Sequence, residues 1–125
     1  MRVLNPPELA TPIAAYSHGI EAAGIVFVAG QVPTDKDGDL VGEGDYYAQT
    51  RQVIANAEAV LRASGCTLQD VVYTTVYVRD FDHYDEYNRG WVDAFGEHRP
   101  ARATVQAQLV RENWLVEMQA IAVKR

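Results

Sequence analysis

Short runs of hydrophobic residues, some continuous and some alternating with polar ones, predict several β-strands. Two extended stretches are predicted between residues 16 and 29, with the Ala-Ala-Gly sequence at 22–24 as the turn. The second stretch, IVFVAG, is apolar throughout, which is typical of a strand buried on both faces. A longer strand is predicted over 70–80, and two more over about 102–109 and 114–124. In the longer one, alternation with period two places four residues on one face: Val72, Thr74, Val76 and Val78.

Two segments between these strands have helical spacing instead. Over 46–64, apolar residues recur at three- and four-residue intervals on one face, and Gly65 is a natural stop. A second helix is predicted over about 82–95, and Pro100 prevents it from continuing. This helix carries an aromatic stripe, which is more typical of a core-facing side than of a binding surface: Tyr84, Tyr87, Trp91 and Phe95.

The predicted order of elements, ββ-α-β-α-ββ, is that of an α/β sandwich in a single domain spanning residues 1–125. Strand–helix–strand crossovers are right-handed, so both helices lie on one face of the sheet if both crossovers move the same way across it. The strands at 25–29 and 70–78 nevertheless carry apolar residues on both sides. Because no third helix is available to cover the second face, we expect an oligomer that packs through its sheets.

Composition narrows the class of protein. The 125 residues are 48% hydrophobic and 22% charged, which is ordinary for a globular domain. The net charge of −6 disfavours nucleic acid and anionic membrane as partners. No apolar run approaches the roughly 18 residues that a membrane span needs, and the first residues lack the apolar core of a signal peptide. The single cysteine, Cys66, fits a reducing compartment, so we expect a cytoplasmic protein with this thiol packed in its interior.

No metal site is expected. The acidic loop residues Asp35, Asp37 and Asp39 superficially resemble a calcium-binding loop. The spacing fails, because Gly38 falls at the fourth loop position instead of the sixth and Tyr46 stands where a bidentate glutamate is needed. The three histidines show no ligand spacing either.

Arg102 is the residue whose chemistry most needs an explanation, because it begins a strand that otherwise has a buried character. If the last two strands pair antiparallel through the short connection at 111–113, Arg102, Thr104 and Glu117 converge in a small polar pocket. Arginine suits a planar carboxylate ligand, since it offers two parallel hydrogen bonds. Glu117 could orient or deprotonate a water molecule. The alternatives are a structural Arg102–Glu117 ion pair and a solvated edge hairpin.

Several stretches taken together resemble one family. In order, they are AAYSHGIEA, VFVAGQVP, AQTRQVIANAEAVL, VVYTTVYVRD, YNRGWVDAFGEHRPARATV and LVEMQAIAV. They are similar to the RidA/YjgF family of reactive-intermediate (enamine/imine) deaminases. This resemblance implies a chorismate-mutase-like α/β sandwich, with one mixed sheet and two helices on one face. It also implies a homotrimer with active sites between neighbouring subunits.

The activity that the resemblance implies is hydrolysis of 2-imino and 2-enamino acids to 2-keto acids and ammonia, without cofactor or metal. The carboxylate-binding arginine of the family falls on Arg102, and its acidic site residue falls on Glu117. The remaining substrate-binding positions fall on four residues: Tyr16, Gly30, Asn88 and Thr104.

The chain departs from the family pattern at the edge of the implied pocket. Ala14-Ala15 replaces Gly-Pro, Ala29 replaces a serine, Gln119 replaces a glutamate, and the loop at 109–114 lacks a proline and carries Trp114. These departures leave open a relative that acts on a larger enamine such as 2-aminomuconate. A non-catalytic trimer that binds keto acids or amino-acid analogues is the second alternative. The ribonuclease activity also attached to the family is disfavoured by the acidic charge balance.

Overall fold

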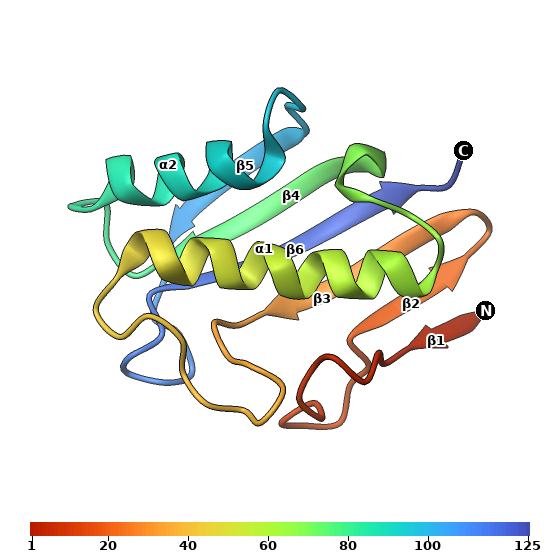
Figure 1. Cartoon of the computed structure of the whole chain (residues 1–125), viewed down its shortest axis with the longest axis horizontal. Helices are drawn as coiled ribbons and strands as arrows, with labels where there is room; N and C mark the ends of the chain where they lie inside the picture. Colours follow the sequence, from red (N-terminus) through yellow and green to blue (C-terminus); the bar gives the residue numbers. More distant parts are fainter.

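The computed structural model describes all 125 residues and contains six strands, two α-helices and one 3₁₀ turn (Figure 1). The strands are β1 (Arg2–Leu4), β2 (Gly19–Ala22), β3 (Ile25–Gln31), β4 (Val71–Val78), β5 (Ala101–Gln106) and β6 (Val116–Val123). The helices are α1 (Tyr46–Ala63) and α2 (Tyr84–Phe95), and the 3₁₀ turn is η1 (Leu68–Asp70). Neither α1 nor α2 has the length and hydrophobicity of a membrane-spanning segment.

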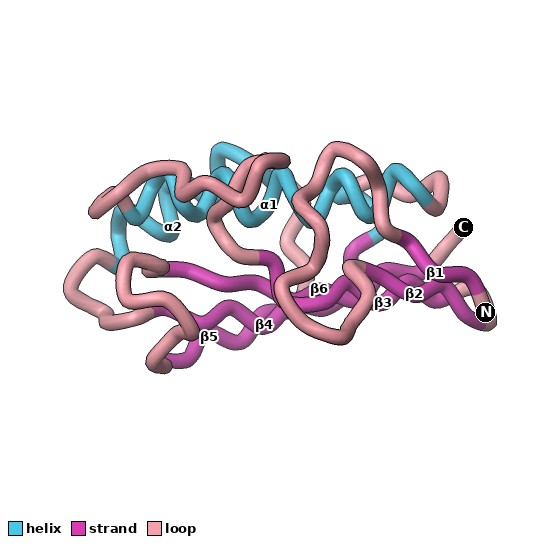
Figure 2. Tube along the Cα trace, turned by 90° about the horizontal axis from the view of Figure 1, so that it is seen from below, coloured by secondary structure: helices cyan, strands magenta, loops and turns pink.

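The strands form one mixed sheet in the order β1-β2-β3-β6-β4-β5. Only β4 and β5 are parallel, and they are joined through α2. Both helices lie against the same face, so the molecule has one helical layer and one sheet layer (Figure 2). The predicted α/β sandwich with two helices on one face is therefore confirmed. The element boundaries agree with the predicted ones to within a few residues, and Gly65 follows α1 with a left-handed φ of 81°.

The predicted pairing of the last two strands is wrong. β4 lies between β5 and β6, and β6 runs antiparallel to both β3 and β4. The connection after β5 passes around the end of β4, where Ala107 N donates to Val78 O and Arg79 N donates to Leu115 O. In this central position, the backbone N–H and C=O groups on both edges of β6 form hydrogen bonds, to β3 and to β4. In a hairpin with β5 alone, the groups on only one edge would do so.

One extra residue also breaks the predicted alternation in β4. Val71 pairs with Ala122 and Tyr73 pairs with Ile121, so two steps along β4 match one step along β6. This bulge turns Val71 into the core and leaves Val72 47% exposed. Val72 was predicted to share a face with the inward-facing Thr74, Val76 and Val78, and that prediction is wrong for Val72 alone.

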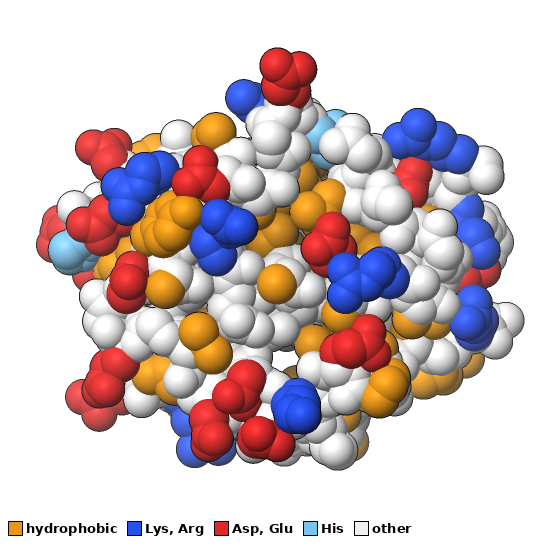
Figure 3. All heavy atoms as spheres, in the orientation of Figure 1, with side chains coloured by type: hydrophobic (Ala, Val, Ile, Leu, Met, Phe, Trp, Pro, Cys, Tyr) orange, Lys and Arg blue, Asp and Glu red, His pale blue; other side chains and the backbone are white.

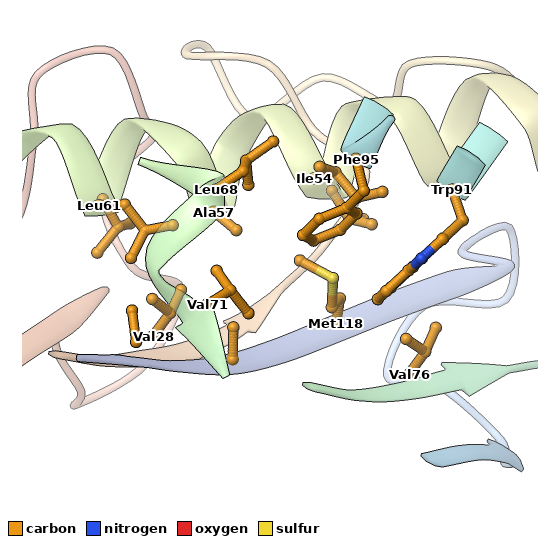
Figure 4. Packing of buried hydrophobic residues seen from close by; sticks show 14 of the residues in the cluster. Val28, Ile54, Ala57, Leu61, Leu68, Val71, Val76, Trp91, Phe95 and Met118 are labelled. Atoms are coloured by element: carbon orange, nitrogen blue, oxygen red, sulfur yellow. The ribbon is translucent and has the colours of Figure 1, made fainter. Parts of the chain in front are cut away.

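The core fills the space between the sheet and the helices (Figure 4). α2 contributes Trp91 and Phe95, whose stacked rings lie 4.4 Å apart and point toward Met118 of β6. The predicted aromatic stripe is thus core at Tyr87, Trp91 and Phe95, whereas Tyr84 remains exposed. Cys66 is buried in the same cluster, as expected for a packing residue.

No helix covers the other face of the sheet. Several large apolar side chains remain at least 40% exposed there: Phe27, Tyr73, Val105 and Val123. The uncovered apolar face required by the sequence pattern is therefore present. The oligomer inferred from it stays a prediction.

A buried glutamine fixes the loop that precedes β6. Gln49 of α1 is fully buried, and its amide nitrogen donates to Gly42 O at 3.0 Å and to Asn113 O at 3.1 Å. Its amide oxygen accepts from Leu115 N at 2.8 Å. Arg79, the residue after β4, holds the same loop, since it donates to the carbonyls of Trp114 and Arg111. The loop before Glu117 is thus tied to two other elements.

Replacing Gln49 with leucine should destabilise the protein strongly. The change keeps the volume similar but leaves Asn113 O and Leu115 N without partners, while Gly42 O keeps its bond from Asp45 N. We therefore expect a loss of about 2–5 kcal/mol in the free energy of unfolding. Urea denaturation measures this loss. Gln69→Leu, at an exposed position with no side-chain hydrogen bond, is the control. A loss no larger than that of the control would contradict the role assigned to Gln49.

Candidate functional site

Arg102 lies on the edge strand β5 and meets only neutral groups. Its guanidinium carbon lies 4.9 Å from the ring centre of Trp91 and 5.2 Å from that of Tyr87. Nη1 donates to Asn88 Oδ1 at 3.1 Å, and Nη2 donates to Tyr84 Oη at 2.9 Å. Arg102 takes part in no ion pair within the chain, so the alternative of a structural Arg102–Glu117 pair is wrong. The cation is held in place while its charge stays uncompensated.

The geometry of α2 explains how these partners meet. Tyr84, Asn88 and Trp91 follow one another at four- and three-residue spacing, so they share one face of α2. Their contacts with Arg102 show that this face lies toward β5. Thr104 lies two residues after Arg102 and projects to the same side, where its hydroxyl lies 2.9 Å from that of Tyr87. Arg102, Asn88 and Thr104 therefore lie together on this side of β5. We call these three residues with Tyr84 the arginine half-site.

Glu117 lies on β6 between Val116 and Met118, which are both buried in the core. Alternation along the strand directs its carboxylate to the opposite, helix-free face. No hydrogen bond or ion pair compensates this carboxylate, and partial burial raises the pKa of Glu117 above the ordinary value. The carboxylate is thus a better proton acceptor than an exposed one.

Gly30 leaves the space that the Glu117 carboxylate occupies. The β3–β6 register shifts between Val28 and Gln31, which marks a bulge next to Gly30. A Cβ atom on Gly30 would overlap the carboxylate of Glu117, so no other residue fits here without displacing it. Tyr16 lines the same pocket as Gly30. Gly30 thus adjoins the Glu117 carboxylate on one side and shares a pocket with Tyr16 on the other, and we call these three residues the glutamate half-site.

The two half-sites do not meet within one chain. Arg102 projects toward α2, Glu117 projects to the helix-free face, and β4 separates their strands. The prediction that Arg102, Thr104 and Glu117 converge in one pocket of a single chain is therefore wrong. It failed because it depended on a β5–β6 pairing that does not exist.

Sequence reasoning missed the role of Tyr84 and Trp91 as contacts of Arg102. Both had been assigned to a core stripe. The sequence did contain a clue for Tyr84. It lies one helical turn before Asn88, and this spacing places the two side chains next to each other on one face of the helix.

The acidic loop has a local explanation. The carboxylate oxygens of Asp35, Asp37 and Asp39 lie within 4.8 Å of one another. Asp35 Oδ1 accepts hydrogen bonds from the amides of Asp37 and Asp39, at 2.9 and 3.0 Å. Asp35 therefore shapes the turn between Thr34 and Leu40, which is the ordinary use of aspartate in such loops.

Two departures from the family pattern have identifiable contacts. Gln119 accepts a hydrogen bond from the Tyr77 hydroxyl at 3.2 Å on the helix-free face. Trp114 is buried, lines the same pocket as Tyr16 and Gly30, and is covered by the guanidinium of Arg111 at 5.9 Å. The loop at 109–114 therefore forms part of the pocket wall.

Known proteins resemble this chain over almost its whole length. Residues 7–124 match the family model described as Endoribonuclease L-PSP. A RutC family protein of Pyrococcus horikoshii is 42% identical over 114 residues, which cover 90% of both proteins. A putative endoribonuclease of Thermotoga maritima has a TM-score of 0.93 at 35% identity, covering 100% of this chain and 98% of that one. The YjgF gene product of E. coli has a TM-score of 0.90 at 27% identity, covering 100% of both chains. With this fold and these matches, the chain belongs to the YjgF/RidA family.

Proposed function

We propose that the protein is a hydrolytic deaminase that converts 2-imino and 2-enamino acids to 2-keto acids and ammonia. The observation that carries the proposal is the state of Arg102. A guanidinium fixed by an amide, a hydroxyl and two aromatic rings, with no carboxylate of its own chain nearby, is arranged to bind an anionic ligand. Family membership supports a small carboxylate as that ligand.

The complete site is proposed to form between two chains of a homotrimer. The exposed apolar sheet face supports an assembly, because a patch of this kind is unusual on a free surface. The separation of the half-sites supports a shared site, in which Arg102 of one chain faces Glu117 of its neighbour. A ring in which each chain donates one half-site at each side would contain as many complete sites as chains.

In the proposed mechanism Arg102 holds the substrate carboxylate, with Asn88 and Thr104 beside it, while Gly30 and Tyr16 contact the substrate from the neighbouring chain. Glu117 takes a proton from water as the water oxygen bonds to the carbon of the protonated imine, and the carbon–nitrogen double bond becomes a single bond. Glu117 then gives this proton to the nitrogen, which leaves as ammonia. The hydroxyl proton passes to Glu117 as the carbon–oxygen double bond forms. An enamine first takes a proton at its β-carbon to become the imine. The sequence involves no oxidation or reduction, and fixing the reactants supplies much of the rate.

Two other functions are weighed against this one. A non-catalytic trimer would bind keto acids through Arg102 without releasing ammonia. Ribonuclease activity is suggested by the description of the family model. It is less well supported, because the net charge is −6 and basic and acidic side chains are interspersed on the helical face (Figure 3). A cytoplasmic location fits the proposal, since the one cysteine is unpaired and buried.

Removing the guanidinium of Arg102 should abolish most of the activity. An amino-acid oxidase or lyase generates the imine, and keto-acid formation is followed with and without the protein. For Arg102→Gln we expect kcat/KM to fall by roughly 30- to 5,000-fold, which corresponds to about 2–5 kcal/mol. Arg102→Lys keeps the charge but loses the two-pronged geometry, so a loss of at least about tenfold is expected there as well.

Arg89→Lys is the matched control for Arg102. Arg89 also lies over an aromatic ring, that of Tyr47 at 4.8 Å, but outside both half-sites.

If the wild-type protein accelerates none of several imines while binding keto acids, the non-catalytic alternative replaces the proposed function.

Activity should fall as the pH is lowered through the pKa of Glu117. Glu117 must be ionised to accept a proton. Because burial raises its pKa, kcat/KM should begin to fall at a higher pH than it would if the base were an exposed glutamate. Glu117→Gln should lose most of the activity and this acid limb. Glu112→Gln, at an exposed loop position, should keep both. An unchanged acid limb in Glu117→Gln would show that another group is titrating.

A further inference from the structure

A preformed pocket extends from Tyr16 and Gly30 of the glutamate half-site, and the rest of its lining has no role in the mechanism described above. Its volume is about 360 Å³, and Tyr16 and Gly30 form part of its lining. Gly30 is the junction, because the Glu117 carboxylate lies against the position of its missing Cβ atom. Three walls enclose the rest of the pocket: the segment at 9–13, the loop at 32–40 and the loop at 111–114.

The first wall is held by a buried histidine. His18 Nε2 lies 2.6 Å from the carbonyl oxygen of Ala10, which can only accept, so this nitrogen carries the proton. Nδ1 is then free to accept from the side-chain amide of Gln31 at 3.3 Å, and Gln31 also donates to Ala29 O. His18 is 9% exposed and Gln31 is 3% exposed. The irregular N-terminal segment is thereby tied to the end of β3 beside Gly30.

The other two walls are held by amide side chains of α1. Asn56 donates to the carbonyls of Val32 and Thr34, both at 3.0 Å. Gln49 holds Asn113 O and Leu115 N on either side of Trp114. Buried polar side chains thus fix all three walls before any ligand arrives, which is the property of a built binding pocket.

The chemistry of the lining indicates what the pocket accepts. Trp114 is 4% exposed and forms one wall, and aliphatic residues complete the apolar part: Leu9, Pro12, Ile13 and Leu40. Asp39 and Arg111 are the only lining residues with a full charge, and both are exposed. Polar residues line the pocket as well, but the side chains of His18, Gln31 and Asn56 already make hydrogen bonds within the chain. The pocket therefore suits an uncharged group.

We propose that this pocket holds the substrate side chain, and that the protein prefers 2-imino acids with branched or aromatic side chains to 2-iminopropanoate. The inference rests on the proposed function, in which Arg102 binds the carboxylate and Glu117 deprotonates the water that attacks the imine carbon. The imine carbon carries a carboxylate, a nitrogen that leaves as ammonia, and the side chain, so the side chain is the group that still needs a place in the site. A methyl group would leave most of the 360 Å³ unused, whereas a branched or aromatic group would fill it.

The preference is tested with imines that an amino-acid oxidase makes from leucine, phenylalanine and alanine. Each rate is divided by the uncatalysed rate of the same imine. We expect kcat/KM, divided by the uncatalysed rate constant of the same imine, to be at least about tenfold higher for the leucine- and phenylalanine-derived imines than for 2-iminopropanoate. Equal values, or a preference for the smallest substrate, would overturn the inference and leave the proposed function standing.

Filling the pocket should remove the preference. Ala10→Phe places a ring in the lining without changing the carbonyl that His18 holds, and we expect the ratio of bulky to small substrate to fall about tenfold or more. Ala55→Phe introduces the same ring on the exposed side of α1 and should keep the wild-type ratio. A ratio in Ala10→Phe equal to that of wild type contradicts the assignment. Should Ala10→Phe fail to fold, Thr11→Phe makes the same test from the neighbouring lining residue.

Calorimetric binding of keto acids separates failure of the pocket from failure of the proposed function. If no imine is accelerated but 4-methyl-2-oxopentanoate binds at least about tenfold more tightly than pyruvate, the enzyme proposal fails and the side-chain pocket is supported. If the two keto acids bind equally, the pocket assignment fails.

Discussion

An arginine that meets only neutral groups in its own chain is the interaction on which the chemistry of this protein depends. Trp91 and Tyr87 lie against the Arg102 guanidinium, while Asn88 and Tyr84 fix its two terminal nitrogens. These contacts orient the cation without neutralising it, so its attraction for an anion is kept for a ligand. A carboxylate at the same place would have made a stable ion pair and an inert edge strand.

The topology of the sheet keeps the one suitable carboxylate away. β4 stands between β5 and β6, and Glu117 projects to the helix-free face while Arg102 projects toward α2. The bulge in β3 and the missing side chain of Gly30 make room for the Glu117 carboxylate in a partly desolvated place, which raises its pKa. The chain therefore places an unpaired cation, Arg102, on the helical side of the sheet and a proton acceptor, Glu117, on the helix-free side. The apolar sheet face gives a reason for a second copy to bring them together.

The sequence predicted local structure well because hydrophobic period is a local property. It predicted both helices, the five longer strands, the turn at 22–24 and the uncovered sheet face. It could not predict that β6 inserts between β3 and β4, since pairing between distant strands leaves no mark in the period of either one. The bulge at Val71 and Val72 could not be predicted for a similar reason. A bulge is defined by how two strands pair, and the sequence of β4 alone does not show where its pairing with β6 is interrupted. For the site, the pattern singled out Arg102 and Glu117. Gly30, Asn88 and Tyr16 came from family resemblance alone, and Tyr84 was hidden in a stripe assigned to the core.

The most direct measurement of the shared site is complementation between two inactive variants. Arg102→Gln chains lack one half-site and Glu117→Gln chains lack the other. Each variant alone should be nearly inactive in imine hydrolysis. If complete sites form between chains, co-expressed mixed oligomers should contain intact sites and recover up to about a quarter of wild-type activity, the fraction expected from random pairing in a ring. No recovery in mixed oligomers that have formed and folded would contradict a site shared by Arg102 and Glu117 of different chains.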